Sequence, residues 1–245
     1  MITSKSNAQI KRVNSLKEKK YRLEHCEYIV EGYKQIREAV SAGKEIINIY
    51  YSPKYTGELT QNEKAIAVSE EVFEKLSEEV TPQGVLAVLK IQKNTPKKPS
   101  GKVLLLDGIS DPGNLGTIIR TANAAGYTDI YLKNCTDAYS PKCVRSAMSG
   151  IFFVNVYLVD ENDVASLFCD FPMICADMKG ENLYSFNAPS QFCLVIGNEA
   201  NGVSEKIKKS CEYTVRIPMR DTCESLNAGV SAAIMMYHLK YCNKN

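Results

Sequence analysis

The sequence predicts an α/β protein in two parts, on three observations. Short apolar runs without clean alternation are separated by stretches of helical spacing, which is typical of parallel strands covered by helices. The 245 residues, 44% of them hydrophobic, suffice for one large domain or two small ones. Residues 90–102 contain five lysines, two prolines and no acid, as linkers do. We therefore expect a small α/β domain at 1–92, a linker at 93–102 and a larger α/β domain at 103–245.

The first part begins with an expected amphipathic helix at 5–22, because Ile10 and Val13 recur at helical spacing among lysines and arginines. Ser6 and Gln9 have the spacing of a capping box. The elements that follow are a strand at 27–32, a helix at 33–44 closed by Gly43, a strand at 46–52, a strand and a helix within 65–79, and a strand at 84–91.

In the second part strands and helices alternate again, with glycine or proline near many of their ends. Strands are expected at 103–108, 129–133, 153–159, 172–178, 192–199 and 213–219. Helices are expected at 114–126, 140–150, 161–170, 204–210 and 226–241. Because ligands of parallel sheets bind beyond the carboxyl ends of the strands, the glycine-bearing loops there should carry the chemistry.

The net charge is only +2, but residues 1–22 hold seven lysines and arginines against one acid. Such an excess is the electrostatic footprint expected for a polyanion. The alternative is an ordinary solvated helix face. The basic residues that would contact a polyanion here are Lys11, Arg12, Lys17, Lys19, Lys20 and Arg22.

Other composition features exclude several classes. The nine cysteines are odd in number and no pair has CxxC spacing, so we expect reduced thiols rather than zinc sites or disulfides. His25 and His238 lie far apart, and neither is near a serine or cysteine in a catalytic arrangement. No apolar run has the length of a membrane span, and the N-terminus lacks the apolar region of a signal peptide. A soluble cytoplasmic protein is expected.

Three loops stand out. In the first, at 107–126, a strand ends at Asp107 and a helix starts near Asn114, with Arg120 almost two turns further on. A helix N-terminus offers free N–H groups to an anion. Taken alone, this loop is better explained as an ordinary strand–turn–helix that carries a surface arginine, because it matches neither GxGxxG nor a Walker loop.

The second loop, at 195–203, carries Gly197, which permits close approach of backbone to a ligand, and Asn198 and Glu199, which suit polar groups or a turn. In the third loop, at 216–233, Ser225 is an N-cap by residue type, and small residues let the last helix pack closely. Capping and packing alone would explain this third loop.

In this order and at this spacing, the loops resemble the three signature motifs of SpoU/TrmH-type RNA ribose 2′-O-methyltransferases of the SPOUT superfamily. The matching residues are Asn114, Arg120 and Ala122 in the first, Gly197, Asn198, Glu199 and Gly202 in the second, and Ile217, Pro218, Met219, Ser225, Leu226 and Asn227 in the third. Residues 140–152 resemble the family's segment between the first two motifs, and residues 1–90 its N-terminal substrate-binding domain. Gly229 departs from the pattern, since many members carry a larger residue there.

The resemblance implies a parallel sheet with a C-terminal trefoil knot, a homodimer, and S-adenosylmethionine as methyl donor, without a metal. The cofactor would contact Gly197, Asn198, Gly202, Ile217, Met219 and Leu226. The catalytic group would comprise Arg120, Asn114, Glu199, Ser225 and Asn227.

The resemblance allows two roles for Arg120. It would act either as the base or as a clamp on the substrate phosphate and the developing oxyanion. We favour the clamp, because an arginine keeps its proton up to a pKa above ~12. Arg145 is a further expected phosphate contact. The N-terminal domain with its basic helix would hold the RNA, and we rank rRNA above tRNA.

Three alternatives remain. The chain would be a tRNA 2′-O-methyltransferase if tRNA were its substrate. A non-catalytic RNA-binding or ribosome-assembly protein would be expected to lose Arg120, Asn227 or the Gly197 loop, and all three are present. A Rossmann-type nucleotide enzyme would need another glycine pattern after its first strand, although Asp129 lies near the required distance.

Overall fold

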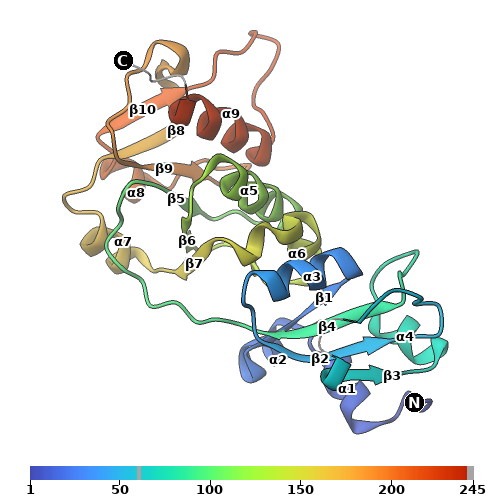
Figure 1. Cartoon of the computed structure of the whole chain (residues 1–245). Coiled ribbons are helices and arrows are strands. Elements are labelled where there is room, and N and C mark those ends of the chain that lie inside the picture. Colours follow the sequence, from blue (N-terminus) through green and yellow to red (C-terminus); the bar gives the residue numbers. More distant parts are fainter. Residues whose placement is uncertain (60–61, 242–245) are drawn as a thin grey trace.

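Figure 1 shows two sheets, each with its own helices, that follow one another along the chain. The computed structural model describes residues 1–59 and 62–241. The segment 91–101, between the sheets, contains neither helix nor strand. It is nevertheless tied to the second sheet, because Asn94 Nδ2 donates to the Val156 carbonyl at 3.2 Å and the Tyr131 hydroxyl to the Lys97 carbonyl at 2.9 Å. The α/β class expected from the sequence is confirmed.

The N-terminal sheet is mixed rather than parallel, with strand order β1-β4-β2-β3. Its elements are α1 (Ala8–Ser15), α2 (Lys19–His25), β1 (Glu27–Glu31), α3 (Tyr33–Ser41), β2 (Ile46–Tyr51), η1 (Asn62–Lys64), β3 (Ala65–Ala67), α4 (Glu70–Leu76) and β4 (Val85–Lys90). β4 runs antiparallel to both β1 and β2, whereas β2 and β3 are parallel. Apolar residues of α1 and α4 cover one face and those of α3 the other.

The single helix expected at 5–22 is wrong, because the chain breaks between α1 and α2. The carbonyl groups of Leu16 and Lys17 at this break both accept hydrogen bonds of 2.7 Å from Nη1 of Arg22. A continuous helix would have used these carbonyls for its own backbone ladder. The buried Arg22 guanidinium therefore takes the place of the backbone N–H donors that one turn of helix would supply.

The C-terminal sheet is wholly parallel, as expected, with strand order β10-β8-β9-β5-β6-β7. Its elements are β5 (Lys102–Asp107), α5 (Pro112–Ala125), β6 (Asp129–Lys133), α6 (Pro141–Ala147), η2 (Met148–Phe152), β7 (Asn155–Leu158), α7 (Glu161–Leu167), β8 (Met173–Asn182), η3 (Leu183–Ser185), β9 (Phe192–Gly197), α8 (Glu205–Lys209), β10 (Tyr213–Arg216) and α9 (Ala228–Tyr241). Leu104 and Leu106 of β5 pack with α5 and α9, while Val103 and Leu105 pack with α7 and α8. Within the described residues, no helix is both long and apolar enough to span a membrane.

Three expected helix starts are wrong. Asn7, rather than Ser6, caps α1 with its side-chain oxygen. Asn227, rather than Ser225, caps α9. α5 begins two residues before the expected position, because the carboxylate of Asp111 caps it. In each case several residues of capping type lie close together, and the local backbone decides which side chain reaches the free N–H groups.

The departure at Gly229 has a packing explanation. A Cβ atom at this position would lie 3.1 Å from Cγ2 of Thr117 on α5. That separation is shorter than carbon atoms in contact prefer. Glycine therefore lets the first turn of α9 lie directly against α5, and both helices contribute side chains to the site described below.

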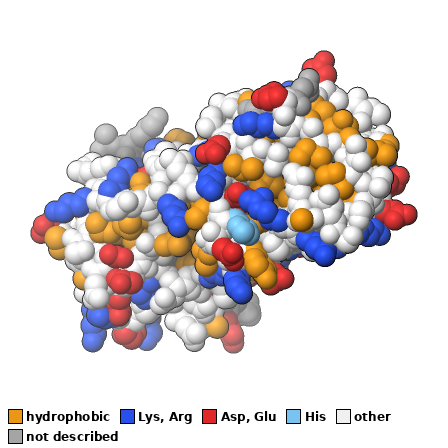
Figure 2. Space-filling model, turned by 90° about the horizontal axis from the view of Figure 1, so that it is seen from below, with side chains coloured by type: hydrophobic (Ala, Val, Ile, Leu, Met, Phe, Trp, Pro, Cys, Tyr) orange, Lys and Arg blue, Asp and Glu red, His pale blue; other side chains and the backbone are white. Residues whose placement is uncertain are grey.

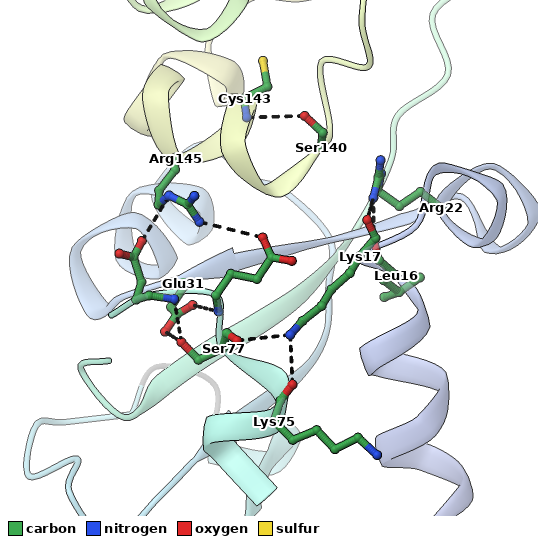
Figure 3. Close-up of polar contacts among 11 residues, drawn as sticks. Leu16, Lys17, Arg22, Glu31, Lys75, Ser77, Ser140, Cys143 and Arg145 are labelled. Carbon is green, nitrogen blue, oxygen red and sulfur yellow. Dashed lines mark hydrogen bonds and ion pairs between the residues drawn. The ribbon is translucent and has the colours of Figure 1, made fainter. Parts of the chain in front are cut away.

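Two arginines form ion pairs of different character between the two parts. The buried Arg22 donates to Asp137 at 2.7–2.8 Å, beside the rings of Tyr28 and Tyr139, whose centroids are 5.0 Å apart. Arg145 of α6 lies above the N-terminal part in Figure 3 and reaches Glu79 at 3.5 Å across the junction. The first pair is shielded from solvent and the second lies on the rim. We therefore assign the docking of the two parts mainly to Arg22.

Arg22→Met is expected to lower the free energy of unfolding by about 3 kcal/mol, because it leaves the Asp137 carboxylate without its buried partner. The matched change Arg145→Gln breaks a rim pair and should cost about 0–1 kcal/mol. Urea unfolding followed by circular dichroism, with limited proteolysis of residues 91–101, measures both. Equal losses in the two variants would contradict the assignment.

Candidate functional site

A chain of side-chain hydrogen bonds connects the three glycine-bearing loops. Asn114 Nδ2 donates to Glu199 Oε1, and Asn227 Nδ2 donates to Asn114 Oδ1, both at 2.8 Å. Ser110 Oγ donates to the second carboxylate oxygen of Glu199 at 3.2 Å. Asn227 Oδ1 in turn accepts from the N–H groups of the first turn of α9. One continuous network thus fixes the starts of α5 and α9 to the loop after β9.

Glu199 stays ionised within this network. Partial burial raises the pKa of its carboxyl group. The hydrogen bonds from Asn114 and Ser110 lower the pKa by more than burial raises it, so the net shift is downward. The carboxylate therefore accepts hydrogen bonds at neutral pH and is not available as a proton donor. Its role in the geometry is to hold amide and hydroxyl groups in place.

The loop after β9 closes on itself. The backbone groups of Asn198 and Gly202 hydrogen-bond to each other in both directions, at 2.9 and 3.0 Å. A Cβ atom at Gly197 would lie 2.1 Å from the carbonyl carbon of Gly202, so only glycine fits there. Gly202 itself has φ = +68°, the left-handed region that glycine adopts without strain. The sequence therefore builds a narrow loop whose backbone is open to a ligand.

A buried ion pair lies beneath this loop. Asp107, at the end of β5, accepts from Lys133 Nζ at the end of β6 at 3.0 Å, and both side chains are almost fully buried. The other carboxylate oxygen of Asp107 accepts from the Ser204 N–H at 2.8 Å. The carbonyl of Gly108 accepts from Asn198 Nδ2 at 2.8 Å. Both ends of the loop 198–204 are thus attached to the end of β5.

Opposing effects act on the pKa of Asp107. Burial raises the pKa, while the hydrogen bonds from Ser204 and the charge of Lys133 lower it, with a net downward shift. Because the pKa of Asp107 is lowered in the folded protein, the ion pair stabilises the fold fully at pH values above the usual pKa of an aspartate. This contribution is lost only as the pH falls through the lowered value.

The loops surround a cavity of about 480 Å³ beyond the carboxyl ends of the strands. All six expected cofactor residues line it, namely Gly197, Asn198, Gly202, Ile217, Met219 and Leu226. Ile196 and Met235 add apolar wall. The charged lining is mixed, with Lys179 and Arg216 positive and Asp177, Glu199 and Glu224 negative. Its volume lies in the range of small-molecule sites. An apolar slot with charged walls suits a purine nucleoside that carries an amino-acid tail.

The structure separates Arg120 from the other expected catalytic residues. Asn114, Glu199 and Asn227 form the network, and Ser225 and Glu199 line the cavity. Arg120 is exposed on α5 and makes no hydrogen bond or ion pair with any residue that the structure describes. Its guanidinium is therefore free for a ligand.

The basic residues expected to contact RNA fall into two sets. Arg12 pairs with Glu27, Lys17 Nζ donates to the carbonyls of Lys75 and Ser77 as Figure 3 shows, and Arg22 and Arg145 join the two parts. These four are engaged with protein, and the buried Arg22 is corrected from an RNA contact to a structural residue. Lys11, Lys19 and Lys20 are exposed. Figure 2 shows basic side chains interspersed with acidic and apolar ones on the face in view, rather than one basic patch.

Sequence reasoning missed Lys133, Ser110 and Ser204 and gave Asp107 no role beyond the end of a strand. A signal was present, since a charged residue closing each of two apolar strands is unusual unless the charges are paired. The part of the chain described holds no group of three or more His, Cys, Asp or Glu side chains able to bind a metal. Its eight cysteines are free, and Cys242 lies outside the described residues.

Comparison with known protein families decides what kind of site this is. The model of the SpoU rRNA Methylase family matches residues 101–237, which include the whole network and the cavity loops. The chain belongs to the SpoU rRNA methylase family. The model of the MRM3-like substrate binding domain matches residues 7–87 of this methylase.

Full-length relatives share both parts of the methylase. It is 32% identical to the 23S rRNA (guanosine(2553)-2′-O)-methyltransferase RlmP of Bacillus subtilis (strain 168), over 98% of each chain. It is 28% identical to the 23S rRNA (uridine(2479)-2′-O)-methyltransferase of Streptomyces viridochromogenes, over 86% of this chain and 81% of that one.

Solved structures give the same picture. The AdoMet-bound rRNA methyltransferase from Sinorhizobium meliloti covers 100% of this chain and 98% of its own, with a TM-score of 0.89 and 25% identity. A structure concerned with 2-OH methylation of C/U34 on tRNA covers only 56% of the methylase, with a TM-score of 0.51 and 26% identity. The likeness to the rRNA enzyme therefore includes the N-terminal part.

Asp107→Ala is expected to lower the free energy of unfolding by about 3–5 kcal/mol, because it leaves the Lys133 ammonium buried and unpaired. The double change Asp107→Ala with Lys133→Met should recover most of that loss, since no charge then remains buried. Both variants should bind S-adenosylmethionine about tenfold more weakly, because the Ser204 N–H has lost its acceptor.

Urea unfolding measures the stability, and isothermal titration calorimetry measures the affinity. Lys133→Met alone keeps the bond to Ser204 and serves as the control for loop position. If the double variant binds the cofactor as tightly as the wild type, Asp107 does not position the loop.

Proposed function

We propose that this SpoU methylase transfers a methyl group from S-adenosylmethionine to a ribose 2′-hydroxyl of 23S rRNA. The observation that carries the proposal is the network of Asn114, Glu199 and Asn227, which joins three loops around one cavity of nucleoside size. Two relatives, matched over 98% and 86% of this chain, are 2′-O-methyltransferases of 23S rRNA. An enzyme, rather than a non-catalytic binding protein, is the function that these findings support.

The cavity fits the cofactor on three counts. The loop at Gly197 brings backbone N–H and carbonyl groups to the wall, where a purine can be hydrogen-bonded. Ile217 and Leu226 supply the apolar sides of a slot for a flat ring. Lys179 and Arg216 supply positive charge suited to a carboxylate. When bound, S-adenosylmethionine supplies a methyl group on a positively charged sulfur, which is open to attack by an oxygen.

Arg120 acts as a clamp on the RNA in this proposal. Its guanidinium is exposed and free of protein partners, so it can take two oxygens of a phosphate or stabilise negative charge as the 2′-hydroxyl loses its proton. Asn114 is fixed on both sides by Glu199 and Asn227, so it can orient a hydroxyl without rearranging. Ser225, on the cavity wall, completes the proposed catalytic group.

The extent of the likeness favours rRNA over tRNA. The matched rRNA enzymes cover both parts of the chain, whereas the tRNA structure covers only 56% of it. We propose that residues 1–92 hold the RNA, that 93–102 connect the parts, and that 103–245 carry out the transfer. Lys11, Lys19 and Lys20 would add salt-dependent attraction to phosphates. Action on ribosomal RNA would place the protein in the cytoplasm.

We further infer the trefoil knot that the resemblance implies. The match of residues 101–237 to the SpoU rRNA Methylase family model and the likeness to the AdoMet-bound rRNA methyltransferase from Sinorhizobium meliloti support this inference.

A homodimer through α9 is also part of the proposal. Val230, Tyr237 and Tyr241 are exposed large hydrophobic residues of α9. Their spacing of seven and then four residues puts them on one face of the helix. An exposed apolar stripe of this kind is typical of an interface.

Arg120→Lys keeps the charge but loses the planar fork, so kcat is expected to fall about 100-fold while the Kd for S-adenosylmethionine stays unchanged. The assay is transfer of tritiated methyl to unmodified 23S rRNA, naked or in assembling subunits, with purified tRNA in parallel. Lys209→Gln, on α8 at the other face of the sheet, is the control for loss of a surface charge.

Label on 23S rRNA that maps to a 2′-O-methyl ribose supports the proposal. Label on tRNA alone would assign the tRNA function instead. Wild-type turnover of Arg120→Lys would rule out the clamp. The absence of both label and cofactor binding would favour the non-catalytic RNA-binding protein.

Tyr237→Glu is expected to convert the dimer to a monomer, because it places a charge in the centre of the apolar stripe. Analytical ultracentrifugation measures the change. Glu212→Gln, away from α9, is the control. A wild-type protein that sediments as a monomer at micromolar concentration would rule out this interface.

A further inference from the structure

The basic residues expected to contact RNA do not by themselves show where the N-terminal part would hold its substrate. Four of the seven are engaged in contacts within the protein. Charge alone also gives no sequence or shape preference. Unpaired bases in RNA are instead held by stacking on aromatic rings and arginine planes. An exposed ring that adjoins an arginine is therefore the feature suited to hold such a base.

Such a group lies at the start of α3. The guanidinium carbon of Arg37 lies 5.8 Å from the centre of the Tyr33 ring, and the rings of Tyr33 and Tyr55 lie 6.2 Å apart. Both tyrosines are partly exposed, and Arg37 and its neighbour Lys34 are exposed. Neither cation forms an ion pair with a described residue. We call Tyr33, Arg37 and Tyr55 the α3 platform.

The platform is held in place by three segments of the chain. The Tyr33 N–H donates to Oε1 of Gln83 at 3.3 Å, and the Tyr55 hydroxyl donates to the Glu58 carbonyl at 2.6 Å. Gly57 leaves room for the Tyr55 ring, since a Cβ atom there would lie 2.6 Å from its hydroxyl oxygen. The first bond fixes the backbone at the start of α3, and the second fixes the Tyr55 ring itself, which therefore loses little conformational entropy when a base stacks on it.

The helix that carries the platform is also connected to the catalytic part. α3 contacts η2, and η2 contacts α5. Gly150 of η2 is so close to α5 that a Cβ atom there would lie 3.0 Å from Cα of Arg120. Figure 1 shows α3 on the side of the N-terminal part that faces α6. α3 is thus connected to the helix that carries Arg120 through η2.

We propose that the α3 platform binds an unpaired base of the RNA substrate by stacking, with Lys34 at an adjoining phosphate. The proposal rests on the proposed function, since it takes RNA as the substrate. It goes further by naming single-stranded, unstacked RNA as the element recognised and α3 as the place.

The test uses the full-length protein and fluorescent single-stranded RNA of about 16 nucleotides. Tyr33→Leu and Arg37→Gln should each raise the Kd for this RNA about tenfold, whereas a duplex of the same length should bind equally to all variants. Lys209→Gln is the matched control for charge. Tyr33→Phe keeps the ring and should restore wild-type affinity. Circular dichroism melting verifies the fold of each variant.

A second measurement locates the RNA directly. Single-stranded RNA carrying 5-iodouridine is photo-crosslinked to the wild-type protein, and the attached peptide is identified by mass spectrometry. Attachment to Tyr33 or Tyr55 is expected. Attachment only to α1 or α2, or unchanged Kd values for both Tyr33→Leu and Arg37→Gln, would overturn the proposal.

The outcomes for the two proposals differ. If Tyr33→Leu weakens RNA binding but the wild-type protein methylates neither RNA class, the platform stands and the proposed reaction fails. If 23S rRNA is methylated with the same KM for RNA by the wild type and by Tyr33→Leu, the reaction stands and the platform fails.

Discussion

The architecture of the site depends on one buried carboxylate, that of Asp107. Its two oxygens are bound by Lys133 and by the Ser204 N–H, and the next carbonyl in the chain receives the Asn198 side chain. Removing two charges from water is expensive, and an apolar pair would fill the same space at less cost. The ion pair instead fixes positions, because it holds the ends of two strands and of the loop 198–204 together. The network of Asn114, Glu199 and Asn227 is built on that fixed loop.

Local patterns in the sequence predicted the elements well because they depend on neighbours. Apolar spacing located nearly every strand and helix, and Gly43 closes α3 as expected, with φ = +66° and the two hydrogen bonds of a glycine-terminated helix. The break before α2 could not be predicted in this way. It depends on Arg22, which binds Asp137, a residue 115 positions away. Such a distant partner leaves no mark in the local spacing.

The site residues follow the same rule: those in local sequence motifs could be predicted, and those that depend on distant partners could not. Most residues of the second and third motifs line one cavity, and Asn114 of the first motif is joined to them by hydrogen bonds, since these loops lie at the same edge of the sheet. Arg120 is outside both the cavity lining and the network. The charge excess of residues 1–22 was a weaker guide, because counting lysines and arginines does not tell which ones find acids or carbonyls in the fold. Arg12 finds Glu27, and Arg22 finds Asp137. The α3 platform has ordinary composition, and only its geometry marks it.

The hydrogen bonds of Asn94 and Lys97 to the second sheet give the linker a further consequence. A mobile linker would leave the N-terminal part without a fixed position relative to the second sheet. The protein would then select its target only by the nucleotide sequence of the RNA. The two linker residues bonded to the second sheet, together with the buried Arg22, hold the two parts at a fixed distance. Under the proposed function, that distance would select a nucleotide by its separation from a second feature of the folded RNA. Two enzymes with the same chemistry could then modify different positions simply by differing in the geometry of this junction.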